Sequence, residues 1–236
     1  EHIIRTIEPG LGWLSINLDP LDPLAVPVVL GSSASRLTTH LLRLEGDFEA
    51  AQRRFTKTAR YDARAAEKHG VQARRGQTRL DFDTYLALTR LAAARWGLSG
   101  TPFPTALYGA LAALPRESVR LWLARVDERD IAGLVMMVYA PGRALYWASA
   151  MHPDHAALNP TKLLLREAIR ELCAEGIEVI NMGPSAGFDG RPLEGVRQLK
   201  EAFGAEAHDY AVILRFNPWA LRLRSARDRL LGIWRR

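Results

Sequence analysis

Three consecutive β-strands joined by very short turns, near the middle of the chain, constrain the fold more than any other feature. Apolar and β-branched residues dominate at 119–126, 131–140 and 143–151. The acidic run at 127–130 and the dipeptide Pro141-Gly142 form the turns between them. Connections this short join antiparallel neighbours, because a parallel crossover needs a dozen or more residues. The segment therefore predicts an antiparallel meander.

Helices and strands alternate after this meander. A helix is predicted over 159–175, since Asn159 suits the N-cap, Pro160 suits the first turn and Gly176 ends it. The rest of the chain predicts a buried strand, a Gly/Pro/Ser-rich loop, a helix, a strand and a basic terminal helix, at 177–181, 182–192, 193–203, 207–216 and 217–235. The resulting order, β-β-β-α-β-α-β, predicts an α/β fold.

The first half of the chain also mixes both types of element. Strands are predicted at 12–18, 35–44 and 71–75. A helical pattern covers 47–69 and is interrupted near 56–58. Two further helices are predicted, one N-capped by Asp81 and running to about Trp96, the other at 104–114.

Positive charge is concentrated in two segments. The net charge is +6, yet residues 53–79 alone hold nine Lys/Arg against two acids, and residues 215–236 hold seven Arg against one. Arg60, Arg64 and Lys68 recur at helical spacing and would form one basic face. This clustering predicts a polyanionic or phosphorylated partner, such as tRNA, a nucleotide-linked sugar, an anionic membrane surface or an acidic polymer. A solvated helix face is the alternative.

One cysteine and the lack of a long apolar run limit the class of protein. Cys173 alone cannot form an internal disulfide or a multi-cysteine zinc site, which favours a reducing compartment. The longest uncharged stretch, 96–115, contains three prolines, and the apolar run at 131–140 is too short to cross a bilayer. We expect a cytoplasmic protein, and association with a membrane surface through the basic terminal helix is left open.

Three segments carry a family resemblance. They are FTKTARYDARAAEKHGV at 55–71, the helix at 159–175 followed by IEVINMGPSAG at 177–187, and GVRQLKEAFGAE at 195–206 with Tyr210 just beyond. In this order and spacing they resemble the FemAB-like branch of the GNAT acyltransferase superfamily. That branch includes the Fem peptidyltransferases and acyltransferase-like proteins linked to polysaccharide synthesis.

The resemblance implies a GNAT-like mixed, largely antiparallel sheet flanked by helices, as the second half of a tandem-GNAT architecture. Residues 1–45 would be the tail of a first half whose front is missing. Residues 46–236 would be a complete second domain, with a basic helical segment at 47–69 and the basic helix at 217–235. The implied activity is transfer of an aminoacyl or acyl group to an amine, in cell-envelope or peptidoglycan synthesis. A non-catalytic binding module for nucleic acid or envelope polymer is the alternative.

The acyl donor is constrained by one departure from the superfamily. Members that use CoA have a glycine-containing turn before the helix that receives the pyrophosphate, whereas HPDHAALN at 152–159 contains no glycine. Glycines let backbone N–H groups approach a phosphate closely. We therefore expect no cofactor, and aminoacyl-tRNA rather than acetyl-CoA as donor. Asn159 and Thr161, at the start of the next helix, remain candidate contacts to an anion.

The resemblance also implies a functional lysine, Lys200, in the helix before Phe203-Gly204. Its ammonium would stabilise the oxyanion of acyl transfer, and a solvent-facing helix lysine is the alternative. Tyr210 and Tyr146 are candidate general acids, or else strand aromatics packed in the core.

The loop that follows the strand at 177–181 is the second candidate site. Gly183, Ser185 and Gly187 would bind a carbonyl or phosphate, and Asp189 would take a proton from the attacking amine. A turn required only for its geometry is the alternative. No histidine lies near Ser185 in the sequence, so a Ser-His-Asp nucleophile is not expected.

A metal site is not expected either. His152, Asp154 and His155 include the residue types that bind zinc, but Pro153 restricts their convergence. A general base or ribose contact, or a plain loop, are the other interpretations of this cluster.

Overall fold

The computed structural model describes residues 13–21, 32–95, 98, 100–186 and 193–216. The chain divides into two compact units, one formed by residues 1–39 with 207–236 and the other by residues 40–206. The predicted terminal helix at 217–235 lies outside the described residues. The division expected between residues 45 and 46 stays a prediction.

The first unit contains three strands, β1 (Trp13–Asn17), β2 (Ser32–Arg43) and β8 (Glu206–Phe216), in the order β1-β8-β2. β1 and β8 are antiparallel. The pairing continues one residue beyond β1, where the Leu18 N–H donates to the Ala211 carbonyl at 3.1 Å. The strands predicted from the two ends of the sequence are thus confirmed.

The second unit contains the other end of β2 and the predicted meander, in the strand order β2-β7-β6-β5-β4-β3. Its further strands are β3 (Gln72–Gly76), β4 (Val119–Val126), β5 (Arg129–Ala140), β6 (Arg143–Met151) and β7 (Val179–Pro184). Neighbours from β3 to β6 are antiparallel, and β6 and β7 are parallel. Asp127 and Glu128 both have positive φ between β4 and β5, as a two-residue hairpin turn requires. The largely antiparallel sheet is confirmed.

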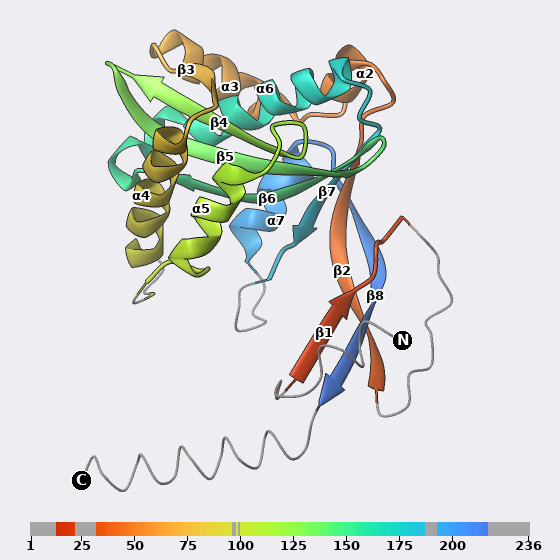
Figure 1. Ribbon diagram of the computed structural model, residues 1–236. Helices are drawn as coiled ribbons and strands as arrows, with labels where there is room; N and C mark the ends of the chain where they lie inside the picture. The colour runs from red at the N-terminus through yellow and green to blue at the C-terminus, as the bar shows by residue number, and fades with distance from the viewer. Residues whose placement is uncertain (1–12, 22–31, 96–97, 99, 187–192, 217–236) are drawn as a thin grey trace, which may run out of the picture. The chain divides into compact units, whose positions relative to one another are not determined.

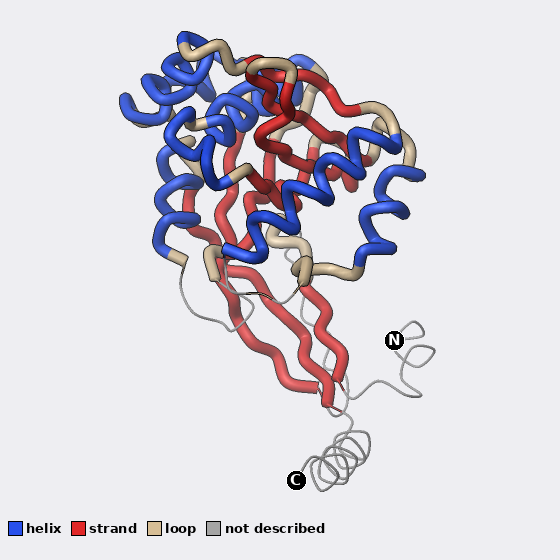
Figure 2. Tube along the Cα trace, turned by 90° about the vertical axis from the view of Figure 1, so that its left-hand side faces the viewer, coloured by secondary structure: helices blue, strands red, loops and turns tan. Residues whose placement is uncertain are grey.

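Helices cover both faces of this sheet (Figures 1 and 2). One face carries α2 (Phe48–Arg53), α3 (Lys57–Lys68) and α6 (Pro160–Ala174), and the other carries α4 (Arg79–Arg95) and α5 (Thr105–Ala113). The remaining elements are the short 3₁₀ helix η1 (Pro153–Leu158) and α7 (Glu194–Ala202). Among the described residues, no helix has the length and apolar character needed to cross a membrane.

The side chains of β4 show how one strand serves both cores. Trp122 and Ala124 pack in the cluster beneath α3 and α6, whereas Leu121 and Leu123 pack in the cluster beneath α4. Successive side chains of a strand point to opposite faces, so a strand covered on both sides is apolar throughout. This explains why the meander has near-continuous apolar runs.

Side-chain caps produce the predicted break in the first helical segment. The Asp47 carboxylate accepts the Glu49 N–H at 2.9 Å and begins α2. The Thr56 hydroxyl accepts the Ala59 N–H at 3.1 Å and begins α3. A second cap inside one helical pattern ends the first helix and starts another.

One predicted cap is wrong, and a second is confirmed with an unexpected geometry. Asp81 is not the N-cap of α4, because the helix begins at Arg79: the Asp81 N–H donates to the Thr78 hydroxyl at 3.2 Å and its carboxylate accepts the Thr78 N–H at 2.8 Å. This is a capping box with the acid at the third position. Asn159 does occupy the N-cap of α6, but in a left-handed conformation and without a side-chain hydrogen bond to the helix.

Candidate active site

The candidate site is built where β7 ends. Gly183 has φ of 74° and its N–H donates to the Asn181 side-chain oxygen at 2.9 Å. A positive φ is a conformation that glycine adopts without strain, and it turns the chain away from the sheet before Ser185. Two of the predicted loop residues, Gly187 and Asp189, lie outside the described residues.

The side chain of Lys200 extends from α7 to this turn and is buried. The residue is 2% exposed, and its Nζ donates to the Gly183 carbonyl at 2.8 Å and to the Pro184 carbonyl at 2.6 Å. Burial lowers the pKa of Lys200 to about 8. The interpretation of Lys200 as a solvent-facing helix lysine is therefore wrong. The structure joins Lys200 and Gly183, which the sequence placed in separate candidate sites.

His40, which the sequence analysis did not select, completes the cluster. It lies on β2, is 3% exposed, and its Nδ1 lies 3.3 Å from the Ser185 hydroxyl. Its Nε2 lies 3.8 Å from a carboxylate oxygen of Glu201. Burial, then the charge of Lys200, lowers the pKa of His40, and Glu201 opposes this shift. The lowered pKa favours the neutral imidazole.

The Ser185–His40 contact could not be seen in the sequence, where no histidine lies near this serine. The two residues are 145 positions apart, and β2 carries His40 to the loop after β7 because the two strands are neighbours in the sheet. The sequence offered little signal for this residue, because His40 follows two threonines in a strand that also contains serines and arginines.

Glu201 is held in place by an exposed ion pair. The Arg197 guanidinium donates to both of its oxygens, at 2.7 and 2.9 Å, and also to Glu194 at 2.6 Å. The carboxylate nearest His40 is therefore oriented along α7 rather than free to rotate.

The other predicted site residues are not brought into this cluster within the second unit. Tyr210 lies on β8 in the first unit, and burial raises its pKa. The hydroxyl of Tyr146 contacts the Ser149 hydroxyl at 2.5 Å. The Thr161 hydroxyl donates to Met151 Sδ at 3.7 Å, and the Asn159 amide donates to the Ala157 carbonyl at 3.5 Å. These contacts supply the tyrosine, threonine and asparagine with partners inside the protein.

The segment that would receive a CoA pyrophosphate uses its N–H groups internally. The Asp154 N–H donates to His152 Nδ1 at 3.3 Å, that of His155 to the His152 carbonyl at 3.1 Å, and that of Asn159 to the Ala156 carbonyl at 3.1 Å. Phosphate binding at a helix start depends on N–H groups that are free to point at the ligand. The residues present here therefore do not fit CoA. His152 acts as the cap of η1, and the described residues contain no group of three metal-binding side chains.

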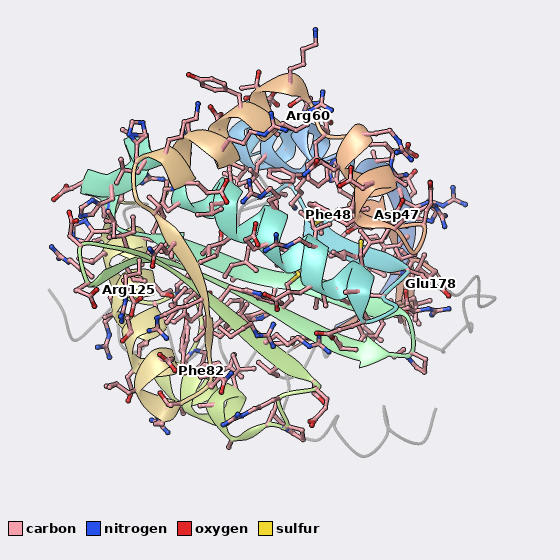
Figure 3. The ribbon with its side chains drawn as sticks, turned by 90° about the horizontal axis from the view of Figure 1, so that it is seen from above. Asp47, Phe48, Arg60, Phe82, Arg125 and Glu178 are labelled. Atoms are coloured by element: carbon pink, nitrogen blue, oxygen red, sulfur yellow. The ribbon has the colours of Figure 1, made fainter. Side chains whose placement is uncertain are left out.

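A second feature is the outer side of α3, which we call the α3 basic face and define as Lys57, Arg60, Arg64 and Lys68. The acids of this helix turn toward α6, where Asp62 pairs with Lys162 and Glu67 pairs with Arg166 at 2.9 Å. Figure 3 shows α3, with Arg60 labelled, alongside α6. A surface cavity of about 710 Å³ is lined by all four cations, together with Gln52, Tyr61, Ala65 and His69.

The basic face ends with α3. Arg74 pairs with Asp130, Arg79 pairs with Asp83, and the Arg75 guanidinium lies 4.2 Å above the Trp122 ring. These three arginines belong to the basic segment at 53–79, but they are engaged in contacts within the protein.

Comparisons with known proteins agree with this architecture. The profile of the acetyltransferase (GNAT) domain matches residues 52–190. No protein of curated function matches the sequence. Among solved structures, FemX is similar with a TM-score of 0.65 at 12% identity, over 78% of this chain and 62% of that chain.

Two further structures share the fold. The C-terminal domain of a putative lysylphosphatidylglycerol synthetase from Agrobacterium fabrum matches with a TM-score of 0.58 at 16% identity, over 83% of this chain and 66% of that one. L-PGS from Bacillus licheniformis matches with a TM-score of 0.54 at 15% identity, over 79% and 62%. The chain thus spans just under two thirds of the length of these three structures. Because the domain profile covers more than half of the sequence, the chain belongs to the acetyltransferase (GNAT) domain family and carries an acyltransferase domain with the fold of its FemAB-like branch.

Proposed function

We propose that this chain is an N-acyltransferase that moves an acyl or aminoacyl group from an activated donor to an amine. The observation that carries the proposal is the buried ammonium of Lys200, fixed between two main-chain carbonyls at the end of β7. A charge is costly to bury, and this one lies at the carboxyl end of a strand, where sites collect in open sheets.

The chemistry follows from the charge that acyl transfer creates. Attack of an amine on an activated carbonyl places negative charge on the carbonyl oxygen. An ammonium has three N–H donors, and Gly183 and Pro184 accept two of those of Lys200, with no third acceptor among the described residues. The third donor is left for that oxygen, which has to enter the turn at Pro184 to reach the buried ammonium. A fixed donor of this kind contributes on the order of 100–1000-fold to kcat.

Aminoacyl-tRNA is the donor that the surface favours. The α3 basic face offers four cations and the exposed ring of Tyr61, a combination that suits phosphates and an unpaired base. The Thr56 N–H, at the start of α3, donates to the Ala202 carbonyl of α7 at 2.8 Å. One contact therefore links the helix that would hold the phosphates to the helix that carries Lys200.

A role in cell-envelope synthesis is part of the proposal. Two of the similar structures are named for the synthesis of lysylphosphatidylglycerol, a lipid that carries an aminoacyl group. Peripheral contact of this chain with an anionic membrane would bring an amine acceptor linked to a lipid within reach.

The test is transfer of a radiolabelled amino acid from charged tRNA to a panel of amine acceptors. Lys200→Met keeps the length of the buried stem and removes the charge, so kcat should fall by roughly 100-fold or more while the KM for the donor changes little. Arg90→Met, which removes an exposed charge on α4, is the control and should transfer normally. Full turnover by Lys200→Met would refute the role of the ammonium.

A non-catalytic binding module is the second candidate, and the α3 basic face favours it because this face is independent of Lys200. The transfer assay with charged tRNA distinguishes an enzyme from a binding module. Binding of tRNA without transfer to any amine acceptor would support the module.

A further inference from the structure

A buried histidine with one unsatisfied ring nitrogen lies directly behind Ser185. The Nε2 atom of His40 is among the few buried side-chain nitrogen atoms in the described part of the chain that have no hydrogen-bond partner. Buried polar atoms are nearly always hydrogen-bonded, so an exception needs an explanation. The charged groups that face this ring are Lys200, Glu201 and Arg197, all from α7.

The surroundings select one tautomer of His40. A proton on Nδ1 would leave the Nε2 lone pair facing the Glu201 carboxylate at 3.8 Å, which is repulsive. A proton on Nε2 points toward that carboxylate instead. It also leaves the Nδ1 lone pair to accept the Ser185 O–H at 3.3 Å. The second arrangement gives Nδ1 a hydrogen-bond donor and directs the Nε2–H toward the carboxylate, beyond hydrogen-bond distance.

His40 and Ser185 differ in their exposure to solvent. His40 is only 3% exposed, whereas Ser185 is partly exposed. Ser185 is therefore the residue of this pair that a substrate meets first, and the imidazole lies behind it. Ser185 directly follows Pro184, whose carbonyl accepts the Lys200 ammonium, so the hydroxyl and the cation lie on adjacent residues of one turn.

We infer that Ser185 and His40 form the proton relay of the acyl transfer, with Ser185 as the catalytic residue in contact with the amine and His40 as the base behind it. The inference rests on the proposed function. It assigns the deprotonation of the acceptor to residues that neither the family profile nor the similar structures identify.

The relay needs no reactant besides the acyl donor and the amine, and every proton is accounted for. The amine nitrogen forms a bond to the donor carbonyl carbon and gives its proton to Ser185 Oγ, while the Ser185 hydroxyl proton moves to His40 Nδ1. The bond between the carbonyl carbon and the leaving oxygen then breaks. The proton on His40 returns through Ser185 to that oxygen. The products are an amide and a free hydroxyl, and both side chains end as they began.

The long contact between His40 and Glu201 fits this cycle. At 3.8 Å it exceeds hydrogen-bond distance while the imidazole is neutral. Protonation of His40 would create a charge that attracts the carboxylate, so this contact is strongest in the state that the reaction passes through. Catalytic hydrogen bonds are often long in ligand-free structures and tighten only during the reaction.

Two substitutions test the relay by turnover with charged tRNA. His40→Asn places an amide near the position of Nδ1, so it keeps a partner for Ser185 but cannot accept a proton. Ser185→Ala removes the exposed member and leaves the strand intact. Each should lower kcat by about 100-fold or more, and the double variant should lose no more than either single one, because the two residues act as a unit. His208→Asn, exposed on β8, is the control.

The pH profile separates a base from a structural histidine. In the wild-type protein kcat should rise with pH as His40 loses its proton, at a pKa below its ordinary value. This rise of kcat with pH, the acid limb of the profile, should be absent from His40→Asn and from Ser185→Ala. An unchanged limb in either variant would overturn the relay even if kcat falls.

A third measurement reads the tautomer without any substrate. Long-range ¹H–¹⁵N spectra of the labelled histidines, with His40→Asn to assign the signal, should show His40 neutral at pH 7 with its proton on Nε2. A proton on Nδ1 would overturn the relay, as would an acyl group found on Ser185 by mass spectrometry when donor is supplied without acceptor. No transfer by the wild-type protein would refute the proposed function itself. Normal transfer by His40→Asn would refute the relay alone.

Discussion

Removal of the Lys200 charge should change how stability depends on pH. The unfolded chain holds the Lys200 proton up to the ordinary pKa of 10.5, whereas burial lowers the pKa in the folded protein to about 8. Between these two pH values the unfolded state binds more protons than the folded state. Folding stability must therefore rise with pH across this window.

The size of the effect follows from the shift. Each pKa unit corresponds to 1.36 kcal/mol, so a shift from 10.5 to about 8 amounts to about 3 kcal/mol. Below about pH 8 the folded protein bears this full cost of burying the ammonium, and above about pH 10.5 the cost is gone. The two carbonyl hydrogen bonds of Lys200 stabilise the charged form, so we treat 3 kcal/mol as the upper end.

Urea unfolding of the wild-type protein and Lys200→Met, followed by tryptophan fluorescence from pH 7 to 10.5, measures this directly. The difference between the two free energies of unfolding cancels the titration of all other groups. It should change by about 3 kcal/mol in favour of the wild type as pH rises. Lys68→Met removes an exposed helix lysine and should show no such change. A difference for Lys200→Met that stays flat within about 0.5 kcal/mol would refute the burial of a charged Lys200.

Three further outcomes are expected. Changing three members of the α3 basic face to alanine (Arg60, Arg64 and Lys68) should flatten the plot of log K against log salt for tRNA by up to about 0.9 per lost phosphate contact on a duplex; an equal loss of charge at Arg90, Arg95 and Arg116 should leave the slope unchanged. Calorimetry should detect weak or no binding of acetyl-CoA, because the N–H groups of η1 are used internally, and micromolar affinity would contradict this reasoning. Gly204→Ala should destabilise the protein more than Gly70→Ala in thermal unfolding. Both glycines have positive φ, at a strain of about 1–3 kcal/mol, but only at Gly204 would the new methyl group meet Arg54 Cβ, at 2.8 Å.

Local signals predicted most of the fold. The turn at Pro141-Gly142 and the apolar runs beside it placed the meander, and Gly70 and Gly176 ended the helices where expected. The N-cap of α4 was wrongly predicted as Asp81, because capping depends on which side-chain oxygen reaches which N–H, and Thr78 and Asp81 both hydrogen-bond there. Local pattern gave the order of elements along the chain, whereas the mixed, largely antiparallel sheet was implied by the family resemblance, and the strand order in the sheet comes from the structure.

Only part of the candidate site could be predicted from the sequence. Lys200 and the loop at Gly183 and Ser185 lie 15 to 17 positions apart, and the resemblance pointed to both. His40 was missed because strand pairing brings together residues that no local pattern connects. The burial of Lys200 was missed for a related reason: helical periodicity indicates which residues share a face, but which face is covered depends on the tertiary packing.

The charge on Lys200 and the protonation of His40 influence each other. Lys200 and His40 approach the same turn from α7 and β2, and two positive charges there would repel each other in surroundings that screen them poorly. With Lys200 charged, His40 is kept neutral, which is the state that a base needs. Loss of the Lys200 proton near pH 8 would remove the oxyanion donor but leave His40 able to accept a proton. The two groups should therefore define opposite limbs of one pH profile. Burial is the main cause of the lowered pKa of His40 and stays in Lys200→Met, but the repulsion by Lys200 adds to it, so this variant should move the acid limb of His40 to higher pH. An acid limb that stays in place in Lys200→Met would show that the two groups do not sense each other.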